Sequence, residues 1–308
     1  MTLPPLLIVG GPTAAGKTAL SIALARALCG EIINADSRQI YRGMDIGTAK
    51  PTPAEQALVP HHLLDLVDPD TPFTLALYVN LARQAIADCA ARHRLPVLVG
   101  GTGLYLRAVA EGYVVPEVPP NLPLRARLAD EAAEHGPGRL VDRLRDLDPE
   151  AAATIDSRNL RRVIRAIEVS EALGSPFSLL QRKAPAYDCH LLLLEGTREG
   201  LFSRADARLE AMLQAGFETE VRTLLGAGYG LDLPAFSALG YRELGQAVLG
   251  CTSRAEAVAS TRASTRAFIK RQETWFRAER SACRLRIENE GVGEAALRST
   301  GAWLDARR

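Results

Sequence analysis

Apolar and polar residues alternate along this chain in two different rhythms. Four short runs are almost continuously apolar, which predicts strands buried on both faces. These runs are residues 6–10, 31–36, 95–101 and 189–196. Between them, apolar residues recur at helical spacing, most clearly over 17–28 and 74–93. Strands that alternate with helices predict an α/β protein with a parallel sheet covered by helices.

The pattern changes near residue 114. Residues 114–123 contain four prolines, which marks a boundary between structural units. From 123 to 182 only helical periodicity is present, and "CHLLLLEG" then returns to a buried strand. We therefore expect an α/β core of residues 1–115 and 187–286, an all-helical insertion of residues 116–186, and a C-terminal tail of residues 287–308.

The composition is that of a soluble globular protein, with 47% hydrophobic and 24% charged residues. The first apolar run is interrupted at Gly16 and Lys17, so we expect neither a signal peptide nor a membrane span. The five cysteines are scattered without a C-x-x-C pair, which favours reduced thiols in a cytoplasmic protein. His61 and His62 lack closely spaced ligand partners in the sequence, so no zinc site is expected.

Charge is distributed unevenly along the chain. The net charge is +1, yet residues 262–286 hold eight basic side chains against two acidic ones. Such a segment is typical of contact with a polyanion, although a solvated helix face explains it equally well.

The segment "GPTAAGKT" at residues 11–18 fits the phosphate-loop pattern G-x-x-x-x-G-K-[ST], between a predicted strand and a predicted helix. In such loops the backbone N–H groups and the helix N-terminus surround phosphate oxygens. Lys17 would reach the terminal phosphates and Thr18 would bind Mg²⁺. The pattern occurs most often in nucleotide-binding proteins, where it is called an ATP-binding motif.

A nucleotide hydrolase or kinase also needs a carboxylate at a neighbouring strand end, to hold the metal or its water. The strand at 95–101 ends without one. Glu195 ends a strand and fits the pattern locally, although it is also explained as an ordinary strand-end residue. The clearest carboxylate is Asp36, at the carboxyl edge of the second strand, where ligands of parallel sheets bind.

Six segments in order carry a resemblance to a known family. They are "GPTAAGKT" (11–18), "NADSRQIYRGMDIGTAKP" (34–51), "GGTGLYLRA" (100–108), "RRVIRAIEV" (161–169), "ALGYREL" (238–244) and "TRAFIKRQETWFR" (265–277). Together they resemble the tRNA dimethylallyltransferases, also called tRNA isopentenyltransferases, of the bacterial type without a zinc finger. The resemblance spans residues 6 to about 286 and implies a P-loop NTPase-like fold.

The resemblance implies transfer of a dimethylallyl group from dimethylallyl diphosphate to the exocyclic amine of the adenine 3′ of the anticodon, with release of pyrophosphate. It implies a monomer with Mg²⁺ as cofactor and the tRNA anticodon stem-loop as partner. Three other hypotheses stay open at this point: a P-loop small-molecule kinase, a prenyltransferase acting on free adenine nucleotides, and a tRNA-binding protein or nucleotide switch without catalysis.

Site residues follow from the resemblance and from the chemistry. The diphosphate would lie on Gly11, Pro12, Thr13, Ala14, Ala15, Gly16, Lys17 and Thr18. Catalysis would rest on Lys17 and Mg²⁺-bound Thr18 at the leaving group, on Asp36 as general base, and on Arg208 as a further cation. Arg204 shares a helix face with Arg208 and is nearly as good a candidate for contact with the diphosphate.

For tRNA the resemblance implies two kinds of contact. Asp36, Ser37, Arg38, Gln39 and Thr102 would surround a flipped adenine. Contacts to the rest of the tRNA would come from Arg125, Arg161, Arg162, Val163, Ile164, Arg165, Gly240, Tyr241, Arg242, Lys270 and Arg271. Arg262, Arg266 and Lys270 recur every four residues as a basic stripe. Trp275 and Phe276 fit core packing better than base stacking.

Overall fold

A computed structural model describes residues 3–180 and 182–307 of the chain. The chain divides into two compact units, and each is described here by itself. The first unit comprises the residues up to Ala110 and those from Ala186 onward, and the second comprises Glu111–Pro185. The junctions lie a few residues from those expected, at a point where the sequence changes from strand and helix to helix alone.

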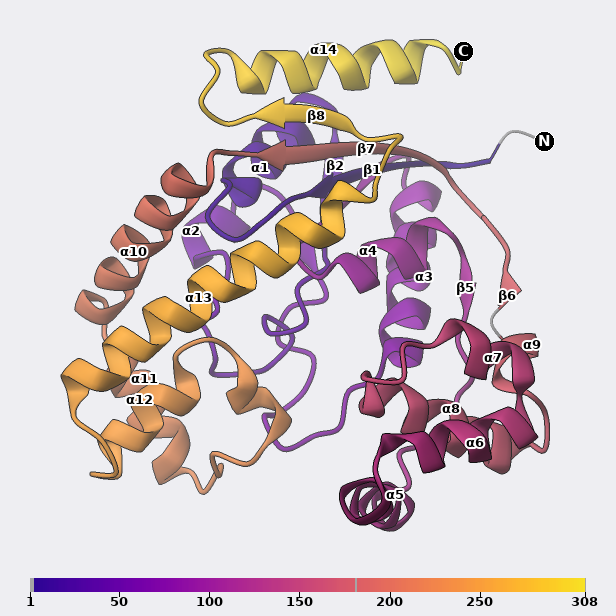
Figure 1. Ribbon diagram of the computed structural model, residues 1–308. Helices are drawn as coiled ribbons and strands as arrows, with labels where there is room; N and C mark the ends of the chain where they lie inside the picture. Colours follow the sequence, from indigo (N-terminus) through magenta and orange to yellow (C-terminus); the bar gives the residue numbers. More distant parts are fainter. Residues whose placement is uncertain (1–2, 181, 308) are drawn as a thin grey trace. The chain divides into compact units, whose positions relative to one another are not determined.

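The first unit is built on a six-stranded sheet in which every neighbouring pair is parallel, in the order β3-β2-β4-β1-β7-β8. Figure 1 labels β1, β2, β7 and β8 of this sheet. The strands are β1 Pro5–Gly10, β2 Gly30–Asn34, β3 His61–His62, β4 Leu95–Gly100, β7 Asp188–Glu195 and β8 Cys283–Arg286. The predicted parallel sheet with flanking helices is confirmed. Sequence analysis missed only the edge strands β3 and β8, which are too short and too polar to give an apolar run.

Alternate residues of the central strands pack on opposite faces of the sheet. Leu7 and Val9 belong to a core cluster that also contains residues of α1 (Lys17–Ala27) and α14 (Val292–Asp305). At Gly10 the other face meets Leu106 of α4 (Gly103–Ala110). On that side α3 (Leu75–Ala91) packs against β2 and β4. Helix α14, in the segment that we expected only as a tail, therefore packs on the core.

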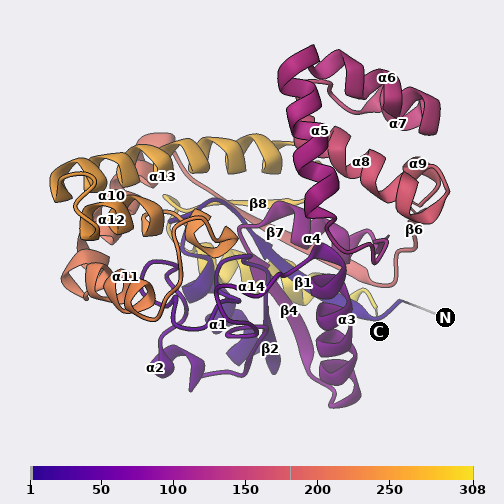
Figure 2. The ribbon, with the colours of Figure 1, turned by 90° about the horizontal axis from the view of Figure 1, so that it is seen from below.

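Two long helices, α10 (Arg198–Gln214) and α13 (Arg254–Arg277), lie side by side in Figures 1 and 2. Ion pairs connect them along their length: Arg198 with Glu273, Arg266 with Asp206, and Arg262 with Glu210. Part of the basic stripe of the sequence therefore serves to join α13 to α10 through ion pairs. Arg262 and Arg266 are committed to carboxylates of α10 and are not the free phosphate-binding charges that we expected.

The segment after β2 is fixed by two charged side chains, the partly exposed Glu220 and the buried Lys50. Glu220 of α11 (Phe217–Gly226) accepts hydrogen bonds from the backbone N–H groups of Asp45, Ile46 and Gly47, at 2.7–3.2 Å. The Lys50 ammonium is 3% exposed and bonds to Asp45 and Asp65, each at 2.5 Å. These bonds hold "MDIGTAKP" (44–51) in place. This part of the segment in turn anchors "DSRQ" (36–39).

The remaining elements of the first unit are short. Helix α2 (Pro53–Gln56) leads into β3. The 3₁₀ helix η1 (Pro234–Ser237) precedes α12 (Tyr241–Val248), and η1 and α12 both pack with α11. Among the described helices, none is long and apolar enough to cross a membrane.

The second unit is a helical bundle with its own core. Its helices are α5 Leu122–His135, α6 Pro137–Leu147, α7 Pro149–Thr154, α8 Leu160–Leu173 and α9 Phe177–Leu180. The antiparallel pair β5 (Tyr113–Val114) and β6 (Arg182–Lys183) stands at its chain ends. Leu128, Leu140 and Ile167 are fully buried in its centre. Five helices over this stretch agree with the helical periodicity of the sequence.

Candidate active site

The phosphate loop connects the end of β1 to the start of α1. Gly11 is required there, because a Cβ at this position would lie 2.6 Å from the carbonyl oxygen of Leu194. Gly16, the N-cap of α1, has a φ of 89°, in the left-handed region that favours glycine. The helix has no side-chain cap and no acidic residue in its first turn. Its N-terminal N–H groups and dipole therefore favour an anion.

Two backbone donors of the loop are already occupied within the protein. The Thr13 N–H donates to Oε1 of Gln272 at 2.8 Å, and the Ala15 N–H donates to the Pro12 carbonyl at 3.3 Å. We expected the backbone N–H groups of the phosphate loop to face phosphate. The N–H groups of Thr13 and Ala15 already have partners in the Gln272 side chain and in the turn. The donors that we expect to face phosphate are therefore those at the start of α1.

Lys17 lies in an environment with more positive than negative charge. Its Nζ donates to the Pro12 carbonyl at 2.8 Å. The pKa of Lys17 is lowered to about 8, chiefly by burial; Asp36 opposes this shift and the nearby Arg208 adds to it. Burial also lowers the pKa of Arg208, again against the attraction of Asp36. Lys17, Arg208 and Asp36 therefore interact electrostatically in one site. A bound anion would balance the excess positive charge of this site.

The choice between Arg204 and Arg208 is informed by their surroundings. Arg204 is exposed, and its Nε donates to the Ala14 carbonyl at 2.8 Å. Arg208 is half-buried and interacts with Lys17 and Asp36. The electrostatic interactions with Lys17 and Asp36 therefore favour Arg208 as the cation inside the site, whereas the Arg204 bond to Ala14 helps to hold the phosphate loop.

Asp36 lies two residues beyond the end of β2, in a turn that Asn34 holds. The Asn34 Oδ1 accepts from the Asp36 N–H at 3.0 Å, and its Nδ2 donates to the Leu63 carbonyl at 3.0 Å. The Asp36 Oδ1 accepts from the Arg38 N–H at 2.9 Å. Its Oδ2 has no partner within the part of the chain that the structure describes. One carboxylate oxygen is thus fixed and the other is available to accept a proton.

Thr102 connects the Asp36 segment to the glycine turn after β4. Its Oγ1 accepts a hydrogen bond from the Ser37 N–H at 3.1 Å, and its N–H donates to the Ala35 carbonyl at 3.3 Å. Ser37 and Thr102 therefore lie together beside Asp36, as the resemblance implies. The glycine turn must approach closely, because a Cβ at Gly100 would lie 2.1 Å from the Ala35 carbonyl oxygen.

Arg38 and Gln39 are engaged by the protein itself. The Arg38 Nη1 donates to the Pro234 carbonyl at 2.9 Å. Gln39 directs its Nε2 at the carbonyls of Thr48 and Ala49, at 3.1 and 3.0 Å. In this arrangement both N–H groups of the Gln39 amide hold the anchoring segment, so the expected contact of Gln39 with adenine, which stays a prediction, would use the amide oxygen.

Gln272 is a site residue that sequence analysis did not single out. It lies on α13, is 5% exposed, and its Nε2 donates to the Gly101 carbonyl at 2.9 Å. The buried face of α13 includes Ile269, Gln272 and Phe276, so Gln272 is a polar residue in an apolar stripe. That position was the available signal, but the surrounding basic residues drew attention to the opposite face.

The other α13 residues divide by exposure. Lys270 and Arg271 are exposed and remain available to a polyanion. Phe276 is buried and Trp275 packs with its ring on Gly103, with the Arg107 guanidinium 4.5 Å from its centre. Core packing was the favoured interpretation of the two aromatic residues, and their environment agrees with it.

At the start of α12 the structure corrects one expected tRNA contact. Tyr241 is fully buried and its hydroxyl donates to Oε1 of Glu220 at 2.6 Å. The side chain therefore holds the protein together and cannot touch tRNA. Gly240 has a φ of 88° and contacts Phe217 closely, so its glycine is explained by backbone geometry. Arg242 is exposed and donates from Nε to the Leu231 carbonyl at 3.2 Å.

The helical unit also separates structural arginines from exposed ones. Arg125 forms two bonds to the buried Glu168 carboxylate, at 2.7 and 2.8 Å, and Arg165 forms a third at 2.5 Å. Burial would raise the pKa of Glu168, but these arginines hold it at about 2. The three residues form one network inside the unit, which explains Arg125 and Arg165 structurally, and the expected contacts of these two arginines with tRNA stay predictions.

The expected tRNA-contact residues of α8 lie on two different faces of the helix. Val163 and Ile164 are 1% and 8% exposed in the core of the unit, so their assignment as tRNA contacts through the side chain is wrong. The reason is the helical period, which turns these two positions inward and the neighbouring Arg161 and Arg162 outward. Arg161 and Arg162 remain candidates for phosphate contacts.

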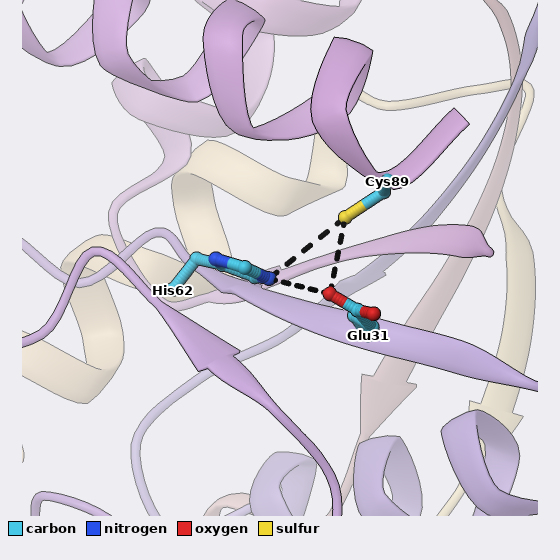
Figure 3. Close-up of side chains that lie close together, drawn as sticks. All are labelled: Glu31, His62 and Cys89. Carbon is cyan, nitrogen blue, oxygen red and sulfur yellow. Dashed lines mark hydrogen bonds and ion pairs between the residues drawn. The ribbon is translucent and has the colours of Figure 1, made fainter. Parts of the chain in front are cut away.

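A second cluster of ionisable side chains lies where β2, β3 and α3 meet (Figure 3). The His62 Nε2 and the Glu31 Oε2 are 2.7 Å apart, and the Cys89 Sγ lies 3.6 Å from that oxygen. We expected His62 to lack ligand partners, and the fold supplies two from distant parts of the sequence. Arg92, however, forms two bonds to the same carboxylate. Burial and Glu31 raise the pKa of Cys89 to about 12. We interpret the cluster as a closed hydrogen-bond network.

Two other expectations can be placed. Glu195, the alternative metal carboxylate, ends β7 and forms an ion pair with Arg284 of β8. An edge-strand pairing therefore explains it without a metal. The five cysteine thiols are all free, as the sequence indicated.

The parallel sheet, the glycine loop at the start of α1 and the converging Lys17, Arg208 and Asp36 define a P-loop-like α/β protein with an anion site. Two family models match the sequence: "IPP transferase" over residues 39–279 and "Isopentenyl transferase" over residues 5–63. The chain belongs to the IPP transferase family, and it is a transferase.

Individual relatives agree with this assignment. A tRNA dimethylallyltransferase of Roseiflexus sp. (strain RS-1) is 50% identical over 303 residues, which cover 98% of this chain and 99% of the relative. One of Roseiflexus castenholzii is 53% identical, covering 89% and 90%. The solved tRNA isopentenylpyrophosphate transferase of Bacillus halodurans is 35% identical, with a TM-score of 0.72 and coverage of 98% and 96%.

Proposed function

We propose that this protein transfers the dimethylallyl group of dimethylallyl diphosphate to the exocyclic amine of the adenine 3′ of the tRNA anticodon. The observation that carries the proposal is the electrostatic interaction of Lys17 and Arg208 with Asp36, together with the uncapped N-terminus of α1 that begins at Lys17. It combines a site for a diphosphate leaving group with a carboxylate for the attacking amine. The names of the similar proteins support the same reaction.

The leaving group requires positive charge. As the allylic C–O bond breaks, its electron pair stays on the pyrophosphate oxygen, and negative charge grows there. Lys17, Arg208 and the first N–H groups of α1 meet that charge without reorganising, and such preorganised stabilisation is usually the largest catalytic contribution. A dianionic or trianionic ligand also keeps Lys17 protonated, since it opposes the burial that lowers its pKa.

The nucleophile requires a base. The adenine amine forms the new C–N bond to the allylic carbon and must lose one proton. Asp36 takes this proton on Oδ2, while Oδ1 is held by the Arg38 N–H. Thr102 and Ser37 fix the neighbouring backbone, so the carboxylate keeps its orientation. General-base assistance of this kind contributes about 10²- to 10⁴-fold.

Magnesium is part of the proposal as the counter-ion of the diphosphate. Thr18 lies in the first turn of α1, and its hydroxyl has no hydrogen-bond partner among the described residues. An oxygen ligand at this place fits Mg²⁺, which prefers oxygen and binds protein sites through few ligands plus phosphate. When bound, the ion would supply further positive charge to the leaving group.

The proposed tRNA contact is through its anticodon stem-loop. A loop adenine is single-stranded and can be flipped into a pocket at a cost of about a few kcal/mol. The exposed Arg161 and Arg162 of the helical unit, and Lys270 and Arg271 of α13, are available for phosphate contacts. A cytoplasmic monomer is the simplest form of this proposal.

A direct assay tests the function. The protein is incubated with radiolabelled dimethylallyl diphosphate, Mg²⁺ and unmodified tRNAs that carry adenine 3′ of the anticodon. Label is expected in the tRNA and pyrophosphate in solution. Transfer to adenosine monophosphate but not to tRNA would instead support a free-nucleotide prenyltransferase. Phosphoryl transfer from ATP with no prenylation would support a kinase.

A further inference from the structure

Gln272 connects the two loops on which the proposed reaction depends. Its Oε1 accepts from the Thr13 N–H of the phosphate loop, and its Nε2 donates to the carbonyl of Gly101 in the turn after β4. Both bonds cross long stretches of sequence; Gln272 is 5% exposed, the bond to Gly101 is buried and the bond from Thr13 is partly buried. A buried side chain with two distant backbone partners restricts where those partners can lie relative to each other.

Only an amide in one orientation satisfies both partners. Thr13 offers a donor and Gly101 offers an acceptor, so the side chain must present an oxygen to one and an N–H to the other. A flipped amide would place N–H against N–H and oxygen against oxygen. Glutamate would place a second oxygen against the Gly101 carbonyl, and leucine would leave both backbone groups without partners, which is unfavourable for buried polar groups.

The bridge continues to the proposed base. Thr102 follows Gly101 directly, and its Oγ1 accepts from the Ser37 N–H next to Asp36. The sequence of contacts is therefore phosphate loop, Gln272, glycine turn, Thr102 and then the Asp36 segment. The amide also lies near the catalytic charge: a Cβ on Gly101 would be 2.5 Å from the Gln272 Nε2 and 3.6 Å from the Lys17 Nζ.

We propose that Gln272 is a positioning residue that sets the leaving-group loop and the general-base segment at the separation required for prenyl transfer. It touches neither substrate and acts through the backbone of Thr13 and Gly101. This inference rests on the function proposed above. A misplacement of about 1 Å between reacting groups can cost about 10²-fold in rate, so loss of the bridge lowers kcat even when both substrates still bind.

Three variants test this role against Gln214→Glu, which changes an exposed glutamine at the end of α10. Gln272→Leu removes both bonds and is expected to lower kcat by about 10- to 100-fold, with tRNA affinity within about twofold of wild type. Gln272→Asn keeps the amide but shortens its reach, so we expect an intermediate kcat.

Gln272→Glu gives a pH signature that a purely structural role would not produce. The protonated acid replaces the amide, because its O–H donates to Gly101 and its C=O accepts from Thr13. The ionised form repels the Gly101 carbonyl and attracts Lys17 away from the diphosphate. The ratio of its kcat/KM to that of wild type should therefore fall as the pH rises, whereas the Gln214→Glu ratio stays constant.

The controls separate the two proposals. Circular dichroism and binding of inorganic pyrophosphate by calorimetry establish that each variant is folded and occupied, and rates are compared at saturating substrate. If wild type transfers label but Gln272→Leu and Gln272→Glu keep wild-type kcat at every pH, the positioning role is overturned and the proposed function stands. If wild type itself transfers no label, both proposals fail.

Discussion

The Ser37 N–H donates a hydrogen bond to the Oγ1 of Thr102, 3.1 Å away. This contact joins the segment after β2 to the turn after β4 and holds the backbone next to Asp36. The Thr102 N–H adds a bond of 3.3 Å to the Ala35 carbonyl on the same segment. Threonine is therefore explained here by its hydroxyl acceptor as well as by any contact with substrate.

Replacing Thr102 with valine keeps the side-chain shape and removes that acceptor. Because a lost hydrogen bond is worth about 1 kcal/mol, kcat should fall by about five- to tenfold. Thr102→Ser keeps the hydroxyl and should remain near wild type. Steady-state transfer to tRNA measures both. Equal activity of the valine and serine variants would show that the Ser37 contact has no role in turnover.

Asp36 is expected to act in turnover and not in tRNA binding. Asp36→Asn keeps an Oδ1 for the Arg38 N–H and loses the basic oxygen, so kcat should fall by about 10²- to 10⁴-fold. Filter binding of tRNA should stay within about twofold. Asp70→Asn changes an exposed carboxylate and serves as the control. A parallel loss of tRNA affinity in Asp36→Asn would make Asp36 a binding residue.

Diphosphate affinity should depend on the ionisation of Lys17. Its pKa of about 8 lies below the ordinary 10.5, mainly because of burial, so the free protein loses this charge as the pH rises through about 8. The Kd for inorganic pyrophosphate, measured by calorimetry, should be lowest below pH 8 and rise above it. Lys17→Ala should bind weakly without that rise. An unchanged pH profile in Lys17→Ala would assign the effect to another group.

Replacement by alanine should affect protein stability at Arg125 and tRNA binding at Arg162. Arg125→Ala leaves the Glu168 carboxylate buried with one partner fewer. The free energy of unfolding, measured by thermal unfolding, should therefore fall by about 3 kcal/mol. Arg162→Ala changes an exposed side chain and should alter stability by less than about 0.5 kcal/mol. We expect it instead to weaken tRNA binding and to reduce its salt dependence. Unchanged tRNA affinity at low salt would remove Arg162 from the interface.

The Glu31 network should make stability sensitive to acid. Hydrogen bonds from Arg92 first, and from His62, hold the pKa of Glu31 at about 2 against an ordinary 4.5. Because the folded-state pKa is depressed, this contribution is complete above pH 4.5 and is lost as the pH falls from 4.5 toward 2. The difference in Tm between wild type and Glu31→Gln should therefore shrink over that range. A difference that stays constant would show that ionisation of this carboxyl group contributes nothing to stability.

The principal strands, the glycine loop and the helical insertion could be predicted from the sequence because each depends on local rules. Apolar runs become buried strands, Gly11 and Gly16 permit backbone that other residues do not, and proline ends a unit. The class of ligand followed in the same way, since the loop and the N-terminus of α1 attract an anion whatever molecule carries it. Asp36 was found because it follows a strand at the edge where ligands bind.

Other features were decided only by the tertiary structure. Gln272 and Glu220 owe their roles to partners that are far away in the sequence, and Glu168 has the distant Arg125 as a partner besides its helix neighbour Arg165. The same holds for the arginines of α13: their spacing predicted a stripe, but the carboxylates of α10 determined which of them are paired. Sequence determined which groups the chain carries and which backbone shapes it allows. Packing determined which charges are buried together, and burial is what turns Lys17, Arg208 and Asp36 into a site.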